Sequence, residues 1–148
     1  MALIYRSGAA SDLPAVFELN RQTLVEYWSY EGLQQAIKDG YDLMVCMDGT
    51  SLAGYLLSHD VIDEVHIMQI AVSPEYRRRG IAKQLSRKLI AAKQGMSLLL
   101  EVRASNHAAQ SLYIKLGFSS YGLRKDYYAP RNHGEPREDA VLMQHQSD

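Results

Sequence analysis

The segment Arg77-Arg78-Arg79-Gly80-Ile81-Ala82 follows an apolar run that ends Ile70-Ala71-Val72, and it opens a helical pattern that continues to about Gln94. A turn between a strand and a helix leaves the first backbone N–H groups of the helix unpaired at the positive end of the helix dipole, where anions bind. The small residues Gly80 and Ala82 allow a phosphate to approach the backbone, and the arginines offer forked donors to its oxygens. We therefore predict a phosphate-binding loop; the alternative is a solvated basic turn that caps an ordinary helix.

The segments around this loop predict two neighbouring parallel strands. Residues 65–72 are mostly apolar and indicate a central strand, and residues 97–102 indicate a second buried strand. Because a helix joins these two strands, we expect them to be parallel and adjacent. Residues 41–47 and 52–59 are strand-like on either side of Asp48-Gly49, a pair favoured in tight turns, which predicts an antiparallel hairpin.

The remaining elements complete a single α/β domain over residues 1–148. We expect, in chain order, a short strand over 4–6, a helix capped by Ser11 or Asp12, a helix over 29–40, a helix over 106–116 capped by Ser105 or Asn106, and closing strands over 119–124 and 140–144. A polar loop over 125–139 joins the closing strands, and a loop of this length in a small domain is more often functional than idle.

Composition excludes several classes of protein. The chain has 148 residues, enough for one domain with a sizeable core. With 16 Lys and Arg against 17 Asp and Glu, the net charge is -1, so general binding to nucleic acid or to an anionic membrane has no electrostatic basis. The single Cys46 excludes an internal disulfide and a cysteine-based metal cluster, and we expect it to be buried and inert. The first five residues do not form a signal peptide, so we expect a cytoplasmic location. The histidines have no spacing that suggests a metal site, so we expect none.

The spacing Arg77-x-x-Gly80-x-Ala82 resembles the acetyl-CoA pyrophosphate loop of the GNAT N-acetyltransferases. Residues 100–106, followed by Leu112-Tyr113 and Gly117-Phe118, are similar to the second half of the same fold. Residues 101–106 with Tyr127-Tyr128 and Glu138-Asp139-Ala140 are similar, more narrowly, to the bacterial ribosomal-protein alanine N-acetyltransferases (RimI type) of this family. The resemblance extends over residues 12–143.

This resemblance implies a fold and a cosubstrate. The expected GNAT fold is α/β (α+β), with a central mixed, mostly antiparallel twisted sheet flanked by helices, and with two parallel strands splayed around acetyl-CoA. Backbone groups at Ile70, Ala71 and Val72 then face the cosubstrate, and a main-chain N–H there holds the oxyanion. The pyrophosphate is expected on Arg77, Arg78, Arg79, Gly80, Ile81 and Ala82, while Asn106 binds the pantetheine amides in addition to capping its helix.

Transfer of an acetyl group from a thioester to an amine requires a neutral amine and a protonated leaving thiol. Glu101 is the candidate base, because a carboxylate in apolar company at the end of a buried strand has a raised affinity for protons. Its alternative role is a salt bridge with Arg103 or a nearby lysine. Asp63 and Glu64 before the central strand are a second choice for the base. Tyr113 is the candidate acid by resemblance, and a core tyrosine is its alternative role.

The acceptor side is expected on aromatic residues. By resemblance, Trp28, Tyr127 and Tyr128 bind an extended peptide N-terminus, although each can simply pack. The chain keeps Trp28-Ser29 but has Tyr27 where the branch commonly has Pro. Glu135, Glu138 and Asp139 either attract a basic substrate tail or form a solvated loop face, and His66 is expected to be a strand residue with a satisfied ring.

Three functions follow from these expectations. The first is direct transfer, in a ternary complex without metal, from acetyl-CoA to a protein N-terminal α-amine, with a small-subunit ribosomal protein that begins with Ala as the preferred acceptor. The second is acetylation of a small-molecule amine in a closed pocket. The third is a non-catalytic acyl-CoA-binding module, which would keep the arginine loop without a competent acid and base.

Overall fold

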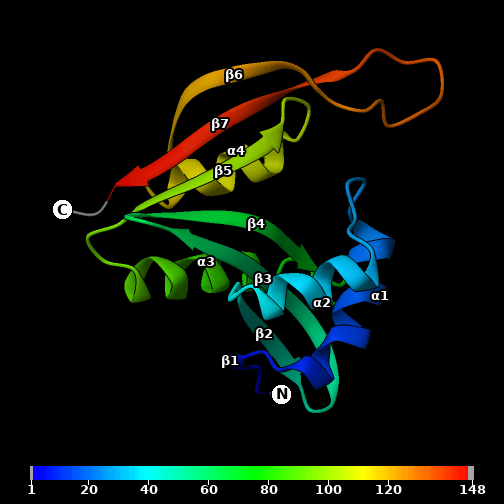
Figure 1. The fold of residues 1–148 in the computed structure, drawn as a ribbon, viewed down its shortest axis with the longest axis vertical. Helices are drawn as coiled ribbons and strands as arrows, with labels where there is room; N and C mark the ends of the chain where they lie inside the picture. Colours follow the sequence, from blue (N-terminus) through cyan, green and yellow to red (C-terminus); the bar gives the residue numbers. More distant parts are fainter. Residues whose placement is uncertain (1, 147–148) are drawn as a thin grey trace.

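The computed structural model describes residues 2–146. Its framework is a seven-stranded sheet with the order β1-β2-β3-β4-β5-β7-β6 (Figure 1). The strands are β1 Ile4–Ser7, β2 Asp42–Asp48, β3 Ser51–Val61, β4 Glu64–Val72, β5 Ser97–Arg103, β6 Ser119–Tyr128 and β7 Glu138–Gln146. Neighbouring strands are antiparallel, except for β4 and β5, which are parallel. The predicted mixed, mostly antiparallel sheet is therefore confirmed.

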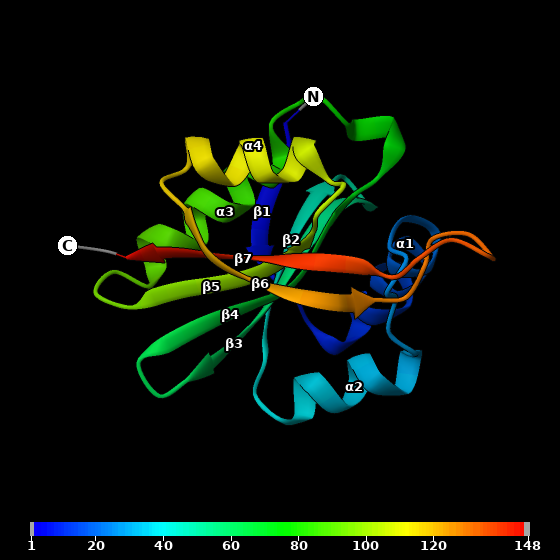
Figure 2. The same cartoon turned by 90° about the horizontal axis from the view of Figure 1, so that it is seen from above.

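Helices cover both faces of the sheet and create a core on each side (Figure 2). Helices α1 Leu13–Thr23 and α2 Tyr30–Lys38 pack on one face, against residues that include Tyr55 and Leu57. Helices α3 Ile81–Ala92 and α4 His107–Lys115 pack on the other face, against residues that include Leu56 and Leu98. Because side chains alternate between the two faces of a strand, adjacent residues such as Leu56 and Leu57 belong to different cores. This explains why the central strands are almost continuously apolar.

Capping residues begin the helices largely as expected. The Ser29 hydroxyl accepts from the N–H of Gly32 at the start of α2, and the Asn106 side chain accepts from the N–H of Ala109 at the start of α4. Asp12 precedes α1, but it does not cap it. Its carboxylate instead accepts from the N–H of Ala9 and pairs with Arg6, so it closes the short turn before the helix.

Two sequence-based boundaries were wrong. The turn of the β2–β3 hairpin lies one residue later than expected, because Asp48 pairs with Ser51 and the turn consists of Gly49 and Thr50. Of the expected turn pair only Gly49 has a positive φ, of 60°. The closing strands are longer than predicted, since β6 continues to Tyr128 across a register irregularity and β7 begins at Glu138. The long polar loop is thereby reduced to residues 129–137.

The parallel pair β4–β5 is short. The two strands pair only at Glu64, Val65 and His66 of β4, opposite Ser97, Leu98 and Leu99 of β5. Beyond these residues the strands diverge toward their carboxyl ends, while β4 stays paired with β3 and β5 stays paired with β7 (Figure 1). The expected splay is therefore present. A register shift in β3–β4 leaves Met68 without an opposite residue, and such bulges often occur beside active sites.

Candidate active site

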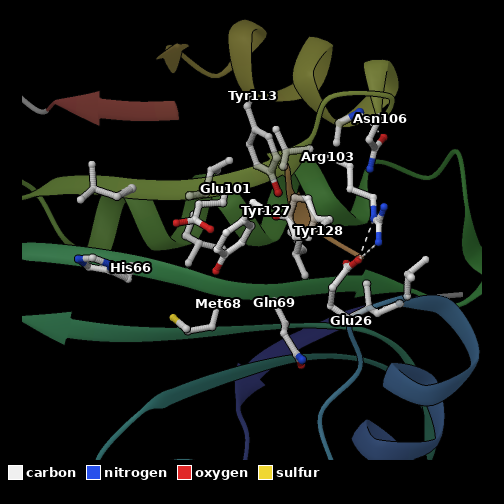
Figure 3. Close-up of a pocket in the computed structure, with 18 of the residues that line it drawn as sticks. Glu26, His66, Met68, Gln69, Glu101, Arg103, Asn106, Tyr113, Tyr127 and Tyr128 are labelled. Atoms are coloured by element: carbon white, nitrogen blue, oxygen red, sulfur yellow. Dashed lines mark hydrogen bonds and ion pairs between the residues drawn. The ribbon is translucent and has the colours of Figure 1, made fainter. Parts of the chain in front are cut away.

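The divergence of β4 and β5 opens a cleft with a volume of about 850 Å³. Its walls come from the loop between α1 and α2, from β4 and β5, from α4, and from β6 with the loop that follows it (Figure 3). Seven residues of the predicted site line this cleft: Trp28, Ile70, Glu101, Asn106, Tyr113, Tyr127 and Tyr128. Sequence positions about 100 residues apart thus meet where β4 and β5 no longer pair with each other.

Strand β4 provides one edge of the cleft. Since β4 pairs with β5 only as far as His66, the backbone groups on that edge of residues 67–72 have no strand partner within the described chain. The side chains of Ile70 and Val72 pack against the core beneath α3 and α4, and Ala71 is buried in the opposite core. Only Ile70 of these three predicted residues lines the cleft with its own atoms, so the others would reach a ligand through the main chain.

The arginine loop lies at the carboxyl end of β4 and leads into α3. Its three arginines are exposed, and the Arg79 guanidinium lies 5.2 Å from the ring centre of Tyr76. Gly80 precedes the helix with φ of 71°, and a Cβ built on it would meet nothing within 4 Å. The first intrahelical bond is donated by Gln84 to Gly80, so the N–H groups of residues 81–83 have no acceptor within the helix.

The arginine loop therefore fits a phosphate, because it combines free amides, open space above a glycine and exposed guanidinium groups. It does not line the cleft between β4 and β5. A ligand that used both sites would have to extend from the loop, along the free edge of β4, into the cleft.

Tyr113 on α4 points its phenol into the cleft, as Figure 3 shows. The residue is 4% exposed, and its ring contacts Phe118 edge-on at 5.3 Å between centroids. Its hydroxyl forms no hydrogen bond with any residue of the described chain, and burial raises the pKa of Tyr113 above its ordinary value. The phenol is thus held in its protonated form with its proton free to be donated.

Glu101 on β5 also lines the cleft, but its surroundings differ from those predicted (Figure 3). We expected apolar company; instead the side chain is 33% exposed and accepts a hydrogen bond from the Arg124 guanidinium on β6 at 2.9 Å. The alternative salt bridge with Arg103 is absent, since Arg103 pairs elsewhere. Sequence reasoning missed Arg124 because β6 meets β5 only through the intervening β7.

The other candidate bases are less well placed. Glu64 pairs with Ser97 at the closed end of β4 and β5, Asp63 lies in the turn before it, and neither lines the cleft. His66 does line it, but the expectation of a satisfied ring was wrong. Its Nε2 is 3.5 Å from the Glu64 carboxylate and forms no hydrogen bond within residues 2–146.

Aromatic residues form the rim of the cleft. Tyr127 and Tyr128 contact each other edge-on at 5.0 Å between centroids, and Arg124 lies 4.2 Å from the Tyr127 ring centre. Burial, followed by the charge of Glu101, raises the pKa of both tyrosines. On the opposite wall the backbone of Trp28 is fixed by the buried side chain of Asn20, which donates to its carbonyl at 2.7 Å and accepts from its N–H at 3.2 Å.

Sequence reasoning missed a polar network beneath this wall. The Tyr55 hydroxyl donates to Gln69 Oε1 at 2.9 Å, and Gln69 Nε2 donates to Asn20 Oδ1 at 3.1 Å. The three side chains are at most 6% exposed. The sequence did contain a signal for this network: Gln69 and Asn20 are polar residues at otherwise apolar positions of a central strand and a helix. Buried polar groups require partners, so these residues could have been expected to bond to each other.

The expectation for Glu138 was also wrong. Its side chain is 20% exposed and pairs with both Arg103 and Arg131, so it belongs neither to a solvated face nor to a free acidic patch. Hydrogen bonding to Ser105, and then to Arg103, lowers the pKa of Glu138 to about 2. Glu135 and Asp139 bond instead within the loop and β6, to Asn132 and to the N–H of Asp126.

Other features bear on cofactors and location. Cys46 is buried and unpaired, as expected. No cluster of three or more His, Cys, Asp or Glu side chains suited to a metal ion occurs in residues 2–146. Among the helices of the described chain, none has the length and apolarity to cross a bilayer.

Residues 13–118 match the model of the acetyltransferase (GNAT) family, and the chain belongs to this family. It is therefore an acetyltransferase built on the fold described above. Over 136 residues it is 35% identical to the ribosomal protein bS18-alanine N-acetyltransferase of Escherichia coli (strain K12), and the match covers 90% of each chain.

Solved structures agree with this assignment. The crystal structure of the ribosomal-protein-S18-alanine N-acetyltransferase from Escherichia coli is similar with a TM-score of 0.89 at 31% identity, over 97% of this chain and 93% of the other. Arabidopsis thaliana NAA60, crystallised in complex with acetyl-CoA, is similar with a TM-score of 0.84 over 97% of this chain and 98% of the other. At 21% identity the second likeness shows the fold alone.

Proposed function

We propose that this enzyme transfers the acetyl group of acetyl-CoA to the α-amine of a protein N-terminus, and that the acceptor is a small-subunit ribosomal protein that begins with alanine. The observation that carries the proposal is the cleft between β4 and β5, which Glu101 and Tyr113 both line. The identity of about one third to a bS18-alanine acetyltransferase over most of the chain supports this acceptor class. We also propose that residues 1–148 form one domain that acts in the cytoplasm.

The proposed donor site combines the arginine loop with the free edge of β4. The pyrophosphate would bind the amides of residues 81–83 and the guanidinium groups of Arg77, Arg78 and Arg79, where negative charge is favoured. The pantetheine arm would pair with the backbone of residues 67–72 as a further strand, because those groups lack a ladder. Asn106 lines the far side of the cleft and has amide groups left over from capping α4.

The chemistry follows from the groups in the cleft. The acceptor nitrogen attacks the thioester carbonyl, the N–C bond forms, and the C–S bond breaks. Glu101 accepts the amine proton, through water where the distance requires it, and Tyr113 donates its proton to the departing thiolate. A free main-chain N–H of β4 stabilises the oxyanion. An α-amine titrates near 7.7–8.0, so a carboxylate assisted by solvent is a sufficient base.

The shape of the cleft favours a peptide over a small amine. Its rim carries large apolar side chains that stay exposed: Val25 46%, Met68 39%, Tyr121 50% and Tyr127 41%. A pocket for a small molecule buries most of its ligand and is lined by enclosed residues. Exposed aromatic and apolar groups along an open cleft instead suit an extended chain that continues into solvent.

One assay tests the proposal. The protein is incubated with acetyl-CoA and with peptides that begin with Ala or Ser, N-terminally blocked peptides with internal lysines, polyamines and amino sugars, and the added acetyl is located by mass spectrometry. We expect acetylation of the α-amine of the Ala peptide. Preferential transfer to polyamines or amino sugars would favour a small-molecule enzyme, and binding of acetyl-CoA without any transfer would favour a binding module.

A further inference from the structure

Arg103 at the end of β5 is a charged residue held almost entirely out of solvent. Its side chain is 4% exposed, and every nitrogen of the guanidinium group donates a hydrogen bond. Nε and Nη2 donate to Glu26 Oε1, with 2.7 Å for the Nε bond. Nη1 donates to Glu138 Oε2 at 2.7 Å, and Nη2 also donates to the carbonyl of Ala129 at 2.8 Å.

These partners come from the two opposite walls of the cleft. Glu26 lies in the loop between α1 and α2, which also carries Trp28. Ala129 and Glu138 bound the loop between β6 and β7, directly after Tyr128. The Cζ atom of Arg103 also lies 4.8 Å from the ring centre of Tyr128. Figure 3 shows Arg103 reaching down toward Glu26 across the end of the cleft.

We propose that Arg103 is a positioning residue that fixes the separation of the two walls and thereby sets the affinity for the acceptor. The inference rests on the proposed function, because it assigns the cleft between these walls to the acceptor. Only a planar fork with several donors serves Glu26, Glu138 and Ala129 at once, and the single ammonium of lysine lacks that geometry.

Within residues 2–146, no hydrogen bond or ion pair joins residues 24–29 directly to residues 126–138. Glu26 is 77 residues from Arg103 and Glu138 is 35 residues from it, so the contacts close long loops at a single point. The loop walls also lie at the end of the sheet where β4 and β5 have already parted. Without the central cation, Glu26 and Glu138 would repel each other, and the walls would separate.

The acetyl-CoA side does not depend on Arg103. The arginine loop and the start of α3 follow the carboxyl end of β4, and none of the hydrogen bonds of the Arg103 side chain reaches them. Loss of Arg103 should therefore raise the KM for the acceptor peptide while leaving the Kd for acetyl-CoA unchanged. A purely structural role would instead lower thermal stability and the fraction of active enzyme without changing KM.

The test compares Arg103→Gln and Arg103→Lys with wild type and with Arg6→Gln. Arg6 forms a two-bond pair with Asp12 and does not line the cleft, so its variant controls for the loss of an arginine ion pair elsewhere. We expect the peptide KM to rise about tenfold in Arg103→Gln, which corresponds to about 1.4 kcal/mol. Arg103→Lys should recover only part of this loss, and Arg6→Gln should retain the wild-type KM.

Glu26→Gln is a second variant. Unlike the loss of Arg103, it does not leave a buried carboxylate without a positive partner. Glu26 is 46% exposed, so the change is tolerated by folding, and it removes the negative charge only from the link to the α1–α2 loop. We expect its peptide KM to rise about fivefold, in the same direction as that of Arg103→Gln. A peptide KM within twofold of wild type in both variants would overturn the proposal.

Hydrogen exchange provides a readout that does not require an active enzyme. In Arg103→Gln and Glu26→Gln, amides of residues 24–29 should exchange faster, and in Arg103→Gln those of residues 129–137 should do so too. Unchanged exchange in both segments would refute the positioning role even if no peptide is acetylated. If exchange becomes faster in the variants but wild type acetylates no peptide, Arg103 does link the two walls, but the proposed acceptor is refuted. The role of Arg103 in acceptor affinity is then refuted as well.

Discussion

Replacement of Tyr113 by Phe should separate chemistry from stability. The change removes only the phenolic oxygen, which points into the cleft and has no partner in residues 2–146. If Tyr113 returns the proton to sulfur, its loss should lower kcat by about 10²–10⁴, the usual contribution of a positioned acid. At 1.36 kcal/mol for each factor of ten, this amounts to about 2.7–5.4 kcal/mol of transition-state stabilisation.

The same substitution should cost almost no folding stability. The ring of Tyr113 stays packed on Phe118, and no donor or acceptor is left unpaired when the hydroxyl is removed. Burial of a hydroxyl without a partner is itself unfavourable, so the midpoint of thermal unfolding should stay constant or rise slightly. A large loss of rate with an intact fold is the combination that a catalytic group produces and a core tyrosine does not.

Tyr55→Phe is the matched control for stability. Tyr55 is fully buried as well, but its hydroxyl donates to Gln69, so the change leaves Gln69 Oε1 without its donor. We expect a loss of about 1–3 kcal/mol in the free energy of unfolding. Both variants are measured by urea unfolding and by single-turnover acetylation of an Ala peptide.

Two results would refute the reasoning on Tyr113. A kcat within threefold of wild type would show that another donor protonates the thiolate. A kcat lost together with stability would show that the hydroxyl has a structural partner.

In wild type, the raised pKa of Tyr113 means that its proton is retained as pH rises past 10, so kcat should not fall between pH 7 and about 9 through its ionisation.

Further predictions concern the base, the phosphate loop and acid stability. Glu101→Gln should lower kcat by about 10²–10⁴ with little change in the Kd for acetyl-CoA, and an unchanged rate would remove Glu101 from the mechanism. Gly80→Val should weaken acetyl-CoA binding at least tenfold by calorimetry, because φ of 71° disfavours a β-branched residue and its side chain would fill the open space above the amides. The folded-state pKa of Glu138, about 2, is below the ordinary 4.5, so its stabilisation is present above pH 4.5 and lost as pH falls toward 2; Glu138→Gln should flatten the dependence of the melting temperature on pH in that window.

Local patterns were enough to predict most of the fold. The hairpin of β2 and β3, the parallel neighbours β4 and β5, the start of α2 near Ser29 and the cap Asn106 each follow from a few adjacent residues. The errors occurred where tertiary contacts extend or shift an element. Pairing with β7 carries β6 on to Tyr128, through residues that have the composition of a loop. The ion pair with Arg6 draws Asp12 away from the cap of α1.

The candidate site was predictable only in part, for a similar reason. Glu101 could be chosen from its place near the end of a buried strand together with the resemblance, and Tyr113 from the resemblance alone; both line the cleft. Their electrostatic partners could not be chosen, because those depend on which strands become neighbours. The insertion of β7 between β5 and β6 brings Arg124 to Glu101, and the folding of two loops over β5 brings Glu26 and Glu138 to Arg103.

The parting of β4 and β5 explains why the cleft lies at this position in the sheet. Each strand stays paired on its outer side, β4 with β3 apart from the bulge at Met68 and β5 with β7, so the divergence costs hydrogen bonds only on the two facing edges. The backbone N–H and C=O groups on those edges must form hydrogen bonds with water or with a ligand, since unpaired buried backbone groups are unfavourable. An extended acetyl donor that has amide groups of its own can replace this water along the two edges. The sheet thus stays stable without substrate, and in the proposed mechanism the same unpaired edge would supply both binding groups and an N–H for the developing oxyanion.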